Sequence, residues 1–275
     1  MKYRMLVSDL DNTLLNSKSQ ISPEVKNAVA FARNKGIQVV LCSGRCYISM
    51  LAYEKALGLP EEGLGISFNG GLIYEAVSMK VLTDYRLERG LAFELIDGLN
   101  SNGASLLIYQ GGKLYAEKDT ADILKYSKGV RIPVDFLHDF RQLSGNISKI
   151  LVRGEKSFIE SLELAMRGVA SGRCNTFFSS DNLLEYCPLE ANKGAGMETV
   201  CGYLGITLEE TIAVGDYDND ISMLKAAGLG IAVANASEKA KAAANYVTDE
   251  TNDQHAVANI IYKYFNGNPC KGIDT

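Results

Sequence analysis

Two acidic clusters, each directly after a short apolar run, constrain the fold of this chain most. The run 5–7 leads into the cluster 9–13, and the run 212–214 leads into the cluster 215–220. Short apolar runs that end in polar turn residues are typical of strands buried on both faces of a parallel sheet, and ligands bind beyond the carboxyl ends of such strands. If the two strands are neighbours, at least four aspartates converge. Since so much negative charge is tolerated only around a cation, the sequence predicts a magnesium-type site.

The first third of the chain alternates strand and helix signals. Ser22 and Pro23 form a helix start, with a capping serine followed by proline at the first helical position, and Gly36 ends that helix. We expect strands over 3–8, 37–42 and 65–68, helices over 23–35 and 47–57, and a hairpin turn at 69–71. Because βαβ crossovers are almost always right-handed, this unit predicts a parallel sheet.

The middle of the chain has a different pattern. Helix-period stretches cover 91–99, 121–127 and 158–166, and apolar runs that suggest strands cover 106–109, 149–152 and 176–178. After Pro188 the first pattern resumes. We therefore predict an α/β fold with a doubly wound, mostly parallel, Rossmann-like core domain over 1–84 and 188–275, interrupted by an inserted α/β domain over 85–187.

The composition is that of an ordinary globular protein. Of the 275 residues, 47% are hydrophobic, and the net charge of −5 argues against nucleic acid or an acidic membrane surface as the main partner. Six cysteines without any C-x-x-C spacing suggest free thiols in a reducing compartment. Because no apolar stretch approaches 18 residues, we expect a soluble, cytoplasmic protein.

Asp9 and Asp11 are the candidate reactive groups. They are two residues apart, so in extended backbone their side chains point the same way. One carboxylate can then attack a substrate while the other exchanges a proton with the attacking or leaving oxygen. A plain aspartate turn at the end of a strand is the structural alternative, which the second acidic cluster outweighs.

The second cluster supplies oxygen ligands for a hard cation. Asp216, Asn219 and Asp220 offer carboxylate and amide oxygens, which Mg²⁺ accepts while it keeps waters and contacts phosphate. Asp220 can instead cap the helix that follows, and for Asp218 we expect capping rather than ligation.

Two further segments carry groups suited to phosphate. Ser43 and Gly44 follow the second predicted strand where a helix opens, which presents backbone N–H groups and a hydroxyl to an anion. Lys193, beside Gly194, supplies a compact positive charge for a phosphate or an aspartyl-phosphate. For Arg45 we expect a structural pair with a neighbouring acid rather than a phosphate contact.

Together these motifs resemble the haloacid dehalogenase-like phosphatase superfamily, in particular its Cof-type members with a class IIB cap. The segment 9–15 is similar to the first motif of that family, and Ser43-Gly44-Arg45 is similar to the second. Lys193-Gly194 is similar to the third motif and 215–220 to the fourth, and the inserted domain lies between the second and third.

The resemblance implies a Mg²⁺-dependent phosphoric monoester hydrolase that forms an aspartyl-phosphate. Asp9 would be the nucleophile and Asp11 the acid and base, with the metal held by Asp9, the Asp11 carbonyl and Asp216. The other implied site residues are phosphate-binding Leu10, Ser43, Gly44, Lys193 and Asn219, and a supporting Asp220. The inserted domain would be the cap that covers the site and selects a small phosphorylated metabolite, with sugar phosphates as the favoured class.

Two other functions stay open. A phosphoryl transferase such as a phosphomutase would use the same residues and pass the group to a second hydroxyl. A non-enzymatic phospho-receiver module also groups acids near strand ends, although the large insert and the late acidic cluster are not expected of it. We expect a monomer or weak dimer with no nucleic-acid or membrane partner, and the sequence does not identify the substrate.

Overall fold

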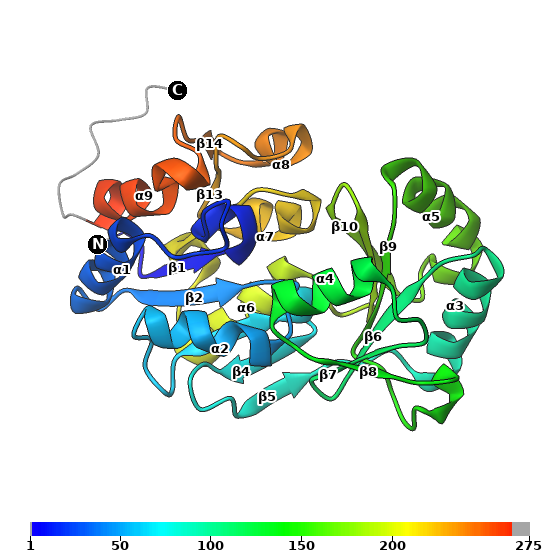
Figure 1. The fold of residues 1–275 in the computed structure, drawn as a ribbon. Helices are drawn as coiled ribbons and strands as arrows, with labels where there is room; N and C mark the ends of the chain where they lie inside the picture. The colour runs from blue at the N-terminus through cyan, green and yellow to red at the C-terminus, as the bar shows by residue number, and fades with distance from the viewer. Residues whose placement is uncertain (1, 266–275) are drawn as a thin grey trace.

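The computed structural model describes residues 2–265, which fold into two α/β parts, each with its own sheet (Figure 1). The larger sheet has the strand order β14-β13-β12-β1-β2-β3-β4-β5, and the smaller has the order β10-β11-β9-β6-β7-β8. The predicted fold class, a doubly wound core with an inserted α/β domain, is confirmed. We call the part with the larger sheet the core and the part with the smaller sheet the cap.

The core sheet is parallel except at one edge. Its strands are β1 (Met5–Ser8), β2 (Gln38–Cys42), β3 (Leu64–Ser67), β4 (Leu72–Glu75), β5 (Val81–Asp84), β12 (Thr211–Gly215), β13 (Leu229–Ala232) and β14 (Tyr246–Val247). β4 and β5 form the antiparallel edge. β1 pairs in parallel with both β12 and β2, and Met5 lies opposite Thr211 and Gln38. The two acidic clusters therefore leave neighbouring strands at the same edge of the sheet, which is the condition that the predicted site requires.

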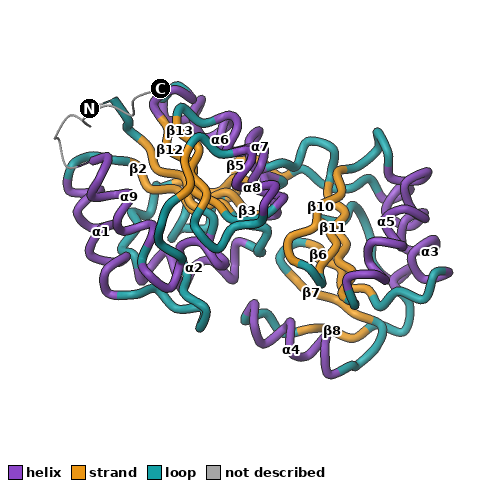
Figure 2. The backbone as a smooth tube through the Cα atoms, turned by 90° about the horizontal axis from the view of Figure 1, so that it is seen from above, coloured by secondary structure: helices purple, strands orange, loops and turns teal. Residues whose placement is uncertain are grey.

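Helices cover both faces of the core sheet, with α1 and α9 on one side and α6 and α7 on the other (Figure 2). The core helices are α1 (Pro23–Asn34), α2 (Tyr47–Ala56), α6 (Lys193–Leu204), α7 (Ile221–Ala226), α8 (Glu238–Ala243) and α9 (Ala256–Phe265). Ser22 caps α1 as predicted, because its hydroxyl accepts a hydrogen bond from the N–H of Val25 at 3.2 Å. Asn192 caps α6 in the same way, which fixes the start of the helix that carries Lys193.

The cap is a sheet with helices packed on it. Its strands are β6 (Leu106–Gln110), β7 (Lys113–Ala116), β8 (Val134–Phe136), β9 (Lys149–Arg153), β10 (Asn175–Ser180) and β11 (Leu183–Cys187). Its helices are α3 (Arg89–Ser101), α4 (Ala121–Val130) and α5 (Lys156–Ala170), of which α3 and α5 pack against each other. The chain enters this part after β5 and leaves it after β11.

Core and cap share an apolar cluster. Along β6, Leu106 and Ile108 face the α3 and α5 side, whereas Leu107 and Tyr109 belong to a cluster with Phe68 of the core. The rings of Phe68 and Tyr109 are 5.4 Å apart. This period of two is expected of a strand whose two faces are both covered, and it lets the cap sheet rest directly on the core.

Several local predictions differ from the structure. The sequence patterns do not predict β5, β8 or β11. They do not predict β11 because Glu185 interrupts an otherwise uncharged run. An irregular helical turn, which the sequence patterns do not predict, covers Leu10–Leu14, and Asn12 within it has a φ of 56°. The five cysteines that the structure describes are buried free thiols, and Cys270 lies outside the described residues. None of the described helices has the length and apolar character that a membrane crossing requires.

Glu54 is a buried acid without a cationic partner among the described residues. It lies on α2, is fully buried, and accepts a hydrogen bond from the hydroxyl of Tyr74 on β4. Its second carboxylate oxygen has no hydrogen-bond partner. Burial raises the pKa of Glu54 from 4.5 to about 7, against the smaller lowering effect of the Tyr74 hydrogen bond.

This raised pKa predicts that the protein loses stability as the pH rises from about 4.5 to 7. Across that window the folded state keeps a proton on Glu54 that the unfolded chain releases, so the free energy of unfolding falls with pH and levels off above 7. We expect Glu54→Gln, which cannot ionise, to be more stable than the wild type at pH 8 by about 1–3 kcal/mol. Urea unfolding at pH 5 and pH 8 measures this, and an equal pH response in both proteins would contradict it.

Candidate active site

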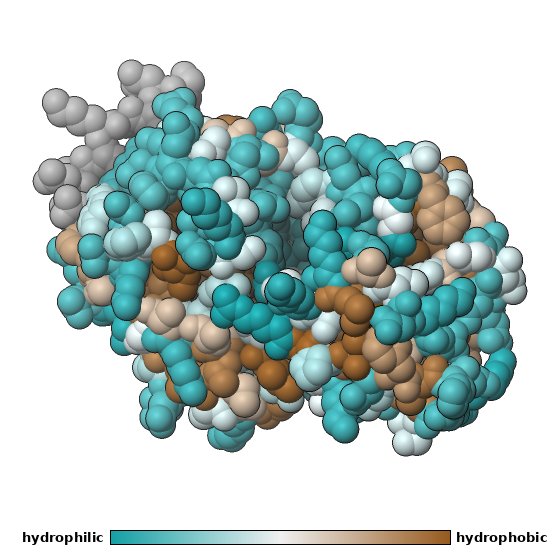
Figure 3. All heavy atoms as spheres, viewed as in Figure 1, coloured by the Kyte–Doolittle hydropathy of each residue, from teal (hydrophilic) through white to brown (hydrophobic). Residues whose placement is uncertain are grey.

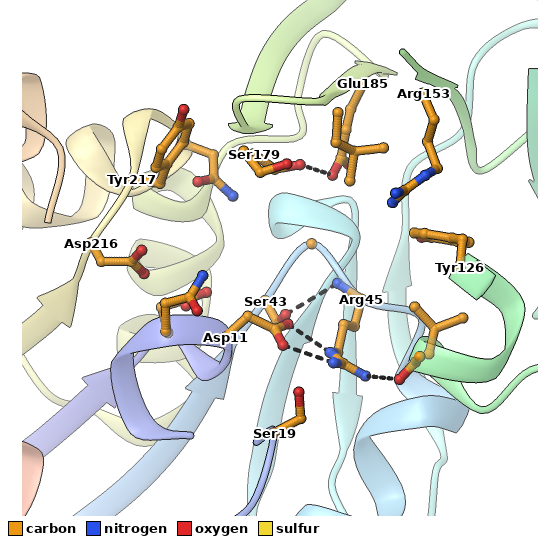
Figure 4. A pocket seen from close by; sticks show the side chains of 18 of the residues that line it. Asp11, Ser19, Ser43, Arg45, Tyr126, Arg153, Ser179, Glu185, Asp216 and Tyr217 are labelled. Atoms are coloured by element: carbon orange, nitrogen blue, oxygen red, sulfur yellow. Dashed lines mark hydrogen bonds and ion pairs between the residues drawn. The ribbon is translucent and has the colours of Figure 1, made fainter. Parts of the chain in front are cut away.

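A cavity of about 330 Å³ lies between the core and the cap, at the carboxyl ends of β1, β2 and β12. Figure 3 shows the hollow between the two parts, bordered largely by hydrophilic residues. From the core, the cavity is lined by Asp9, Asp11, Asn12, Ser19, Ser43, Gly44, Arg45, Asp216, Tyr217 and Asn219. From the cap, it is lined by Lys125, Tyr126, Gly129, Val130, Lys149, Arg153, Ser179, Ser180, Leu183 and Glu185 (Figure 4).

Asp9 lies at the floor of this cavity and is held by a buried lysine. The ammonium of Lys193 donates hydrogen bonds to Oδ1 of Asp9 and to Oδ1 of Asp220. All three side chains are at least nine-tenths buried. The lysine therefore bridges the two acidic clusters across the neighbouring strands β1 and β12.

Asp220 is committed to this structural role. Besides the Lys193 contact, its Oδ2 accepts the backbone N–H groups of Asp216 and Tyr217 at 2.8 and 3.0 Å. Gly215 makes the close approach possible, because a Cβ atom at this position would lie 2.6 Å from Cβ of Asp220. Asp220 does not cap α7 with its side chain. The glycine and aspartate of this cluster are thus needed together for the turn.

Asp216 faces Asp9 across the cavity floor. Its Oδ1 accepts a hydrogen bond from the hydroxyl of Thr13 at 2.7 Å. Oxygens of Asp9, Asp216 and Asp220 lie within 4.8 Å of one another. Three buried carboxylates at this spacing match the oxygen donors that a hard divalent cation takes.

The electrostatics of the cluster support a cation site. Burial raises the pKa of Asp9 from 3.8 to about 7, although the charge of Lys193 opposes the shift. Burial, followed by the nearby charges of Asp9 and Asp220, raises the pKa of Asp216 well above 3.8. Lys193 alone thus does not neutralise the cluster. A divalent cation would neutralise it, so the residues fit Mg²⁺. Asp9 and Asp216 are the carboxylates available to hold the ion, because both oxygens of Asp220 already accept hydrogen bonds.

Asp11 lies higher in the cavity and is tied to Arg45. The guanidinium of Arg45 donates to both carboxylate oxygens of Asp11, at 2.6 and 2.7 Å. Arg45 also donates to the carbonyl of Gly129 on α4 at 3.4 Å and lies 5.6 Å from the ring of Tyr53. Arg45 therefore forms the expected pair with an acid, and in addition it joins that acid to the cap.

The remaining predicted residues occupy different depths. Ser43, Gly44 and Asn219 line the cavity, whereas the side chain of Leu10 is buried in the core between the two aspartates. Helix α2 begins at Tyr47, as predicted, so Ser43 and Gly44 lie in the loop that leads into it. The hydroxyl of Ser43 accepts the N–H of Arg45 at 3.1 Å and thereby shapes this loop.

The expected capping role of Asp218 is wrong. Its carboxylate accepts hydrogen bonds from the hydroxyl of Ser237 at 3.2 Å and from the ammonium of Lys239 at 2.6 Å. These partners come from the region around α8. Asp218 therefore anchors a neighbouring loop instead of its own helix.

Three buried polar residues, Asn69, Lys149 and Glu185, are not among the predicted site residues. Lys149 and Glu185 line the cavity, and Asn69 is hydrogen-bonded to Asn219, which also lines it. The three side chains form one hydrogen-bonded group that joins the cap to the core. A charged residue inside an apolar strand run was the available signal for Lys149 and Glu185. For Asn69, the Asn-Gly pair was assigned to a hairpin turn, and its φ of 57° agrees with a tight connection.

Comparison with known proteins places these motifs in context. The sequence profile of the haloacid dehalogenase-like hydrolases matches residues 6–261. The chain is 29% identical to phosphatase YwpJ of Bacillus subtilis, over 94% of this chain and 98% of that protein. A haloacid dehalogenase-like hydrolase from Bacteroides thetaiotaomicron superimposes with a TM-score of 0.85 at 32% identity, covering 94% of this chain and 98% of that structure. The subclass IIB sugar phosphatase BT4131 shares the fold, with a TM-score of 0.81 at 21% identity and coverage of 96% and 99%.

We predict that Lys193→Met costs about 3–5 kcal/mol of stability, because it removes the cation between two buried carboxylates. The expected result in urea unfolding at pH 8 is a large drop of the midpoint. Lys80→Met is the matched control, since Lys80 pairs with Glu75 at the surface with its side chain 68% exposed. Equal midpoints for the two variants would contradict the role assigned to Lys193.

Proposed function

The chain belongs to the haloacid dehalogenase-like hydrolase family, and from this premise we propose that it is a Mg²⁺-dependent phosphatase of small phosphomonoesters. The observation that carries the proposal is the buried carboxylate of Asp9, held by Lys193 at the floor of a cavity that Asp216 shares. A nucleophile, a counter-charge and a cation site then meet at one point.

Asp9 is the proposed nucleophile. Its free oxygen attacks the phosphorus of the ester, an aspartyl-phosphate forms, and the bond from phosphorus to the ester oxygen breaks. Asp11 gives its proton to the leaving alkoxide. In the second half, Asp11 takes a proton from water, the water oxygen attacks the phosphorus, and the bond to Asp9 breaks, which releases inorganic phosphate.

The neighbouring groups hold the phosphoryl oxygens. We assign this role to the backbone at Leu10 and Gly44, the hydroxyl of Ser43, the ammonium of Lys193 and the amide of Asn219. Of these, Lys193 already contacts Asp9, so one cation serves both nucleophile and phosphate. Asp220 supports Lys193 through the buried pair.

The residues that would hold Mg²⁺ are Asp9, Asp216 and the backbone carbonyl of Asp11. When bound, the ion supplies positive charge that stabilises both the carboxylate nucleophile and the phosphoryl oxygens. Asp220 is not a proposed ligand, because its oxygens accept hydrogen bonds from Lys193 and two backbone N–H groups.

The pair between Arg45 and Asp11 adds a movement to the reaction. Both oxygens of Asp11 are engaged by Arg45, so Asp11 has to turn away from Arg45 whenever it exchanges a proton with the substrate. The cap carbonyl of Gly129 contacts the same guanidinium. A displacement of the cap therefore changes the contacts of Arg45 and, through Arg45, the position of Asp11.

The cap, over residues 85–187, is the proposed substrate-selecting part. It contributes to the cavity an aromatic ring, a guanidinium and hydroxyl groups, from Tyr126, Arg153, Ser179 and Ser180. Hydrogen-bonding groups around a small cavity suit a polyhydroxylated leaving group, which favours sugar phosphates or related metabolites. Phosphoryl transfer to a second hydroxyl is the alternative, and a cytoplasmic location and a monomeric or weakly dimeric state stay predictions.

We expect Asp9→Asn to abolish phosphate release from p-nitrophenyl phosphate, because the amide cannot form the aspartyl-phosphate. A fall of at least three orders of magnitude in kcat is typical for loss of a nucleophile. Asp97→Asn is the control, since Asp97 pairs with Arg141 on the cap surface. Turnover by Asp9→Asn at the wild-type rate would refute the assignment, and absence of turnover by the metal-loaded wild type would favour a binding or signalling role.

A second prediction concerns Mg²⁺ and Asp216. In metal-free buffer, Asp216→Asn should unfold at a higher temperature than the wild type, since it relieves repulsion with Asp9. Added MgCl₂ at a hundredfold excess over Kd should raise the free energy of unfolding of the wild type by about 2.7 kcal/mol, and with it the melting temperature, and should stabilise the variant much less. Thermal unfolding with and without MgCl₂ measures both effects. Identical Mg²⁺ responses would remove Asp216 from the metal site.

A further inference from the structure

A chain of buried hydrogen bonds runs from the cap to the floor of the cavity. The amide of Asn219 donates to Oδ1 of Asn69 at 3.0 Å, and the amide of Asn69 donates to Oε2 of Glu185 at 2.9 Å. All three side chains are at least nine-tenths buried. Asn219 and Asn69 belong to the core, whereas Glu185 lies on cap strand β11. A cap carboxylate thus determines the orientation of a core amide.

The order of donors and acceptors fixes each amide. Glu185 only accepts, so Asn69 must turn its NH₂ group toward the cap and its oxygen toward Asn219. Asn219 must in turn present an N–H to Asn69. Its amide plane is then set, and the second N–H of the same nitrogen is left for a ligand in the cavity that Asn219 lines.

Asn69 also holds the other side of the proposed phosphate site. Its backbone N–H donates to the carbonyl of Ser43 at 3.1 Å. A Cβ atom on Gly44 would lie 3.0 Å from Oδ1 of Asn69 and 3.2 Å from Oε1 of Glu185. The loop 43–44 is therefore packed directly against the same two side chains, which would have to shift to admit a larger residue at position 44.

Lys149 makes the buried carboxylate tolerable and adds a second link. Its ammonium donates to Oε2 of Glu185 at 2.7 Å and to the carbonyl of Gly44 at 2.6 Å. Glu185 also accepts the hydroxyl of Ser179 at 2.6 Å. A buried charge pair gains little stability over apolar residues of the same size, so stability alone does not account for its place at this wall.

We propose that Glu185 and Asn69 are positioning residues, which act through Asn219 and the Ser43–Gly44 loop to prepare the phosphate site only when the cap is seated on the core. The proposal rests on the proposed function, because it assumes that Asn219 and this loop bind the phosphoryl group. It makes the cap a part of the phosphate site as well as a selector of the leaving group.

Two double variants test the hydrogen-bond chain from Glu185 through Asn69 to Asn219, which we call the relay, without leaving a buried charge. Lys149→Met with Glu185→Gln keeps an acceptor for Asn69, and Lys149→Met with Glu185→Met removes it. Both lose the same two charges and the same contact to Gly44. We expect the second to have a kcat/KM for p-nitrophenyl phosphate about 10–100-fold below the first, since small misplacements of binding groups cost this much. Its Kd for inorganic phosphate, from calorimetry, should be about tenfold higher.

A third variant checks the middle of the relay. Asn69→Gly tolerates the positive φ at this position and removes the side-chain hydrogen bonds to Glu185 and Asn219, together with a longer one to the thiol of Cys187. It should lose kcat/KM and phosphate affinity to the same extent as the variant without the acceptor. Glu94→Gln is the control for a charge loss in the cap, since Glu94 pairs with Arg173 at the surface. Urea unfolding of each variant separates a loss of fold from a loss of positioning.

The outcomes separate this inference from the proposed function. If the wild type turns over and the two double variants have equal kcat/KM and phosphate Kd, the relay is overturned and the phosphatase stands. If the wild type binds phosphate without any turnover and the double variants differ in Kd, the relay stands and the phosphatase is overturned. If the wild type neither binds phosphate nor turns over, both are overturned.

Discussion

The placement of Lys193 between Asp9 and Asp220 is the constraint on which the site depends. Carboxylates from two neighbouring parallel strands are buried together, and repulsion between them would oppose folding without a cation. Lys193 supplies one positive charge, and the raised pKa values of Asp9 and Asp216 indicate that one is not enough. A divalent cation bound by Asp9 and Asp216 would supply the positive charge that is still missing.

The same logic of buried charge governs the contact between the two parts of the molecule. Lys149 and Glu185 are almost fully buried, yet they lie at the cavity wall and reach the loop 43–44 and Asn69. Next to them lie the buried rings of Phe68 and Tyr109, which pack against each other. A polar network beside an apolar contact favours one position of the cap, in which Lys149 and Glu185 reach the proposed phosphate-binding groups.

Much of this architecture could be predicted from the sequence, for identifiable reasons. That β1 and β12 are buried parallel strands could be predicted, because each is a continuous apolar run that ends in acids, whereas their direct pairing entered the prediction only as the condition for a shared site. The start of α1 could also be predicted, since its signals at Ser22 and Pro23 are local. β11 could not be predicted, because Glu185 looks incompatible with a buried strand until its partner Lys149, 36 residues earlier, is in view.

By itself, the sequence determined the fold class and pointed to the residues that we propose carry the chemistry, because strand burial, helix caps and acidic motifs are contained within short stretches of chain. Only the tertiary structure decided how these groups divide the work. Asp220 is consumed by Lys193 and two backbone N–H groups, Asp11 is held by Arg45, and Asn69 is turned by a carboxylate 116 residues away. Such partners are chosen by distance and hydrogen-bond geometry across separate strands, which no local pattern of residues encodes.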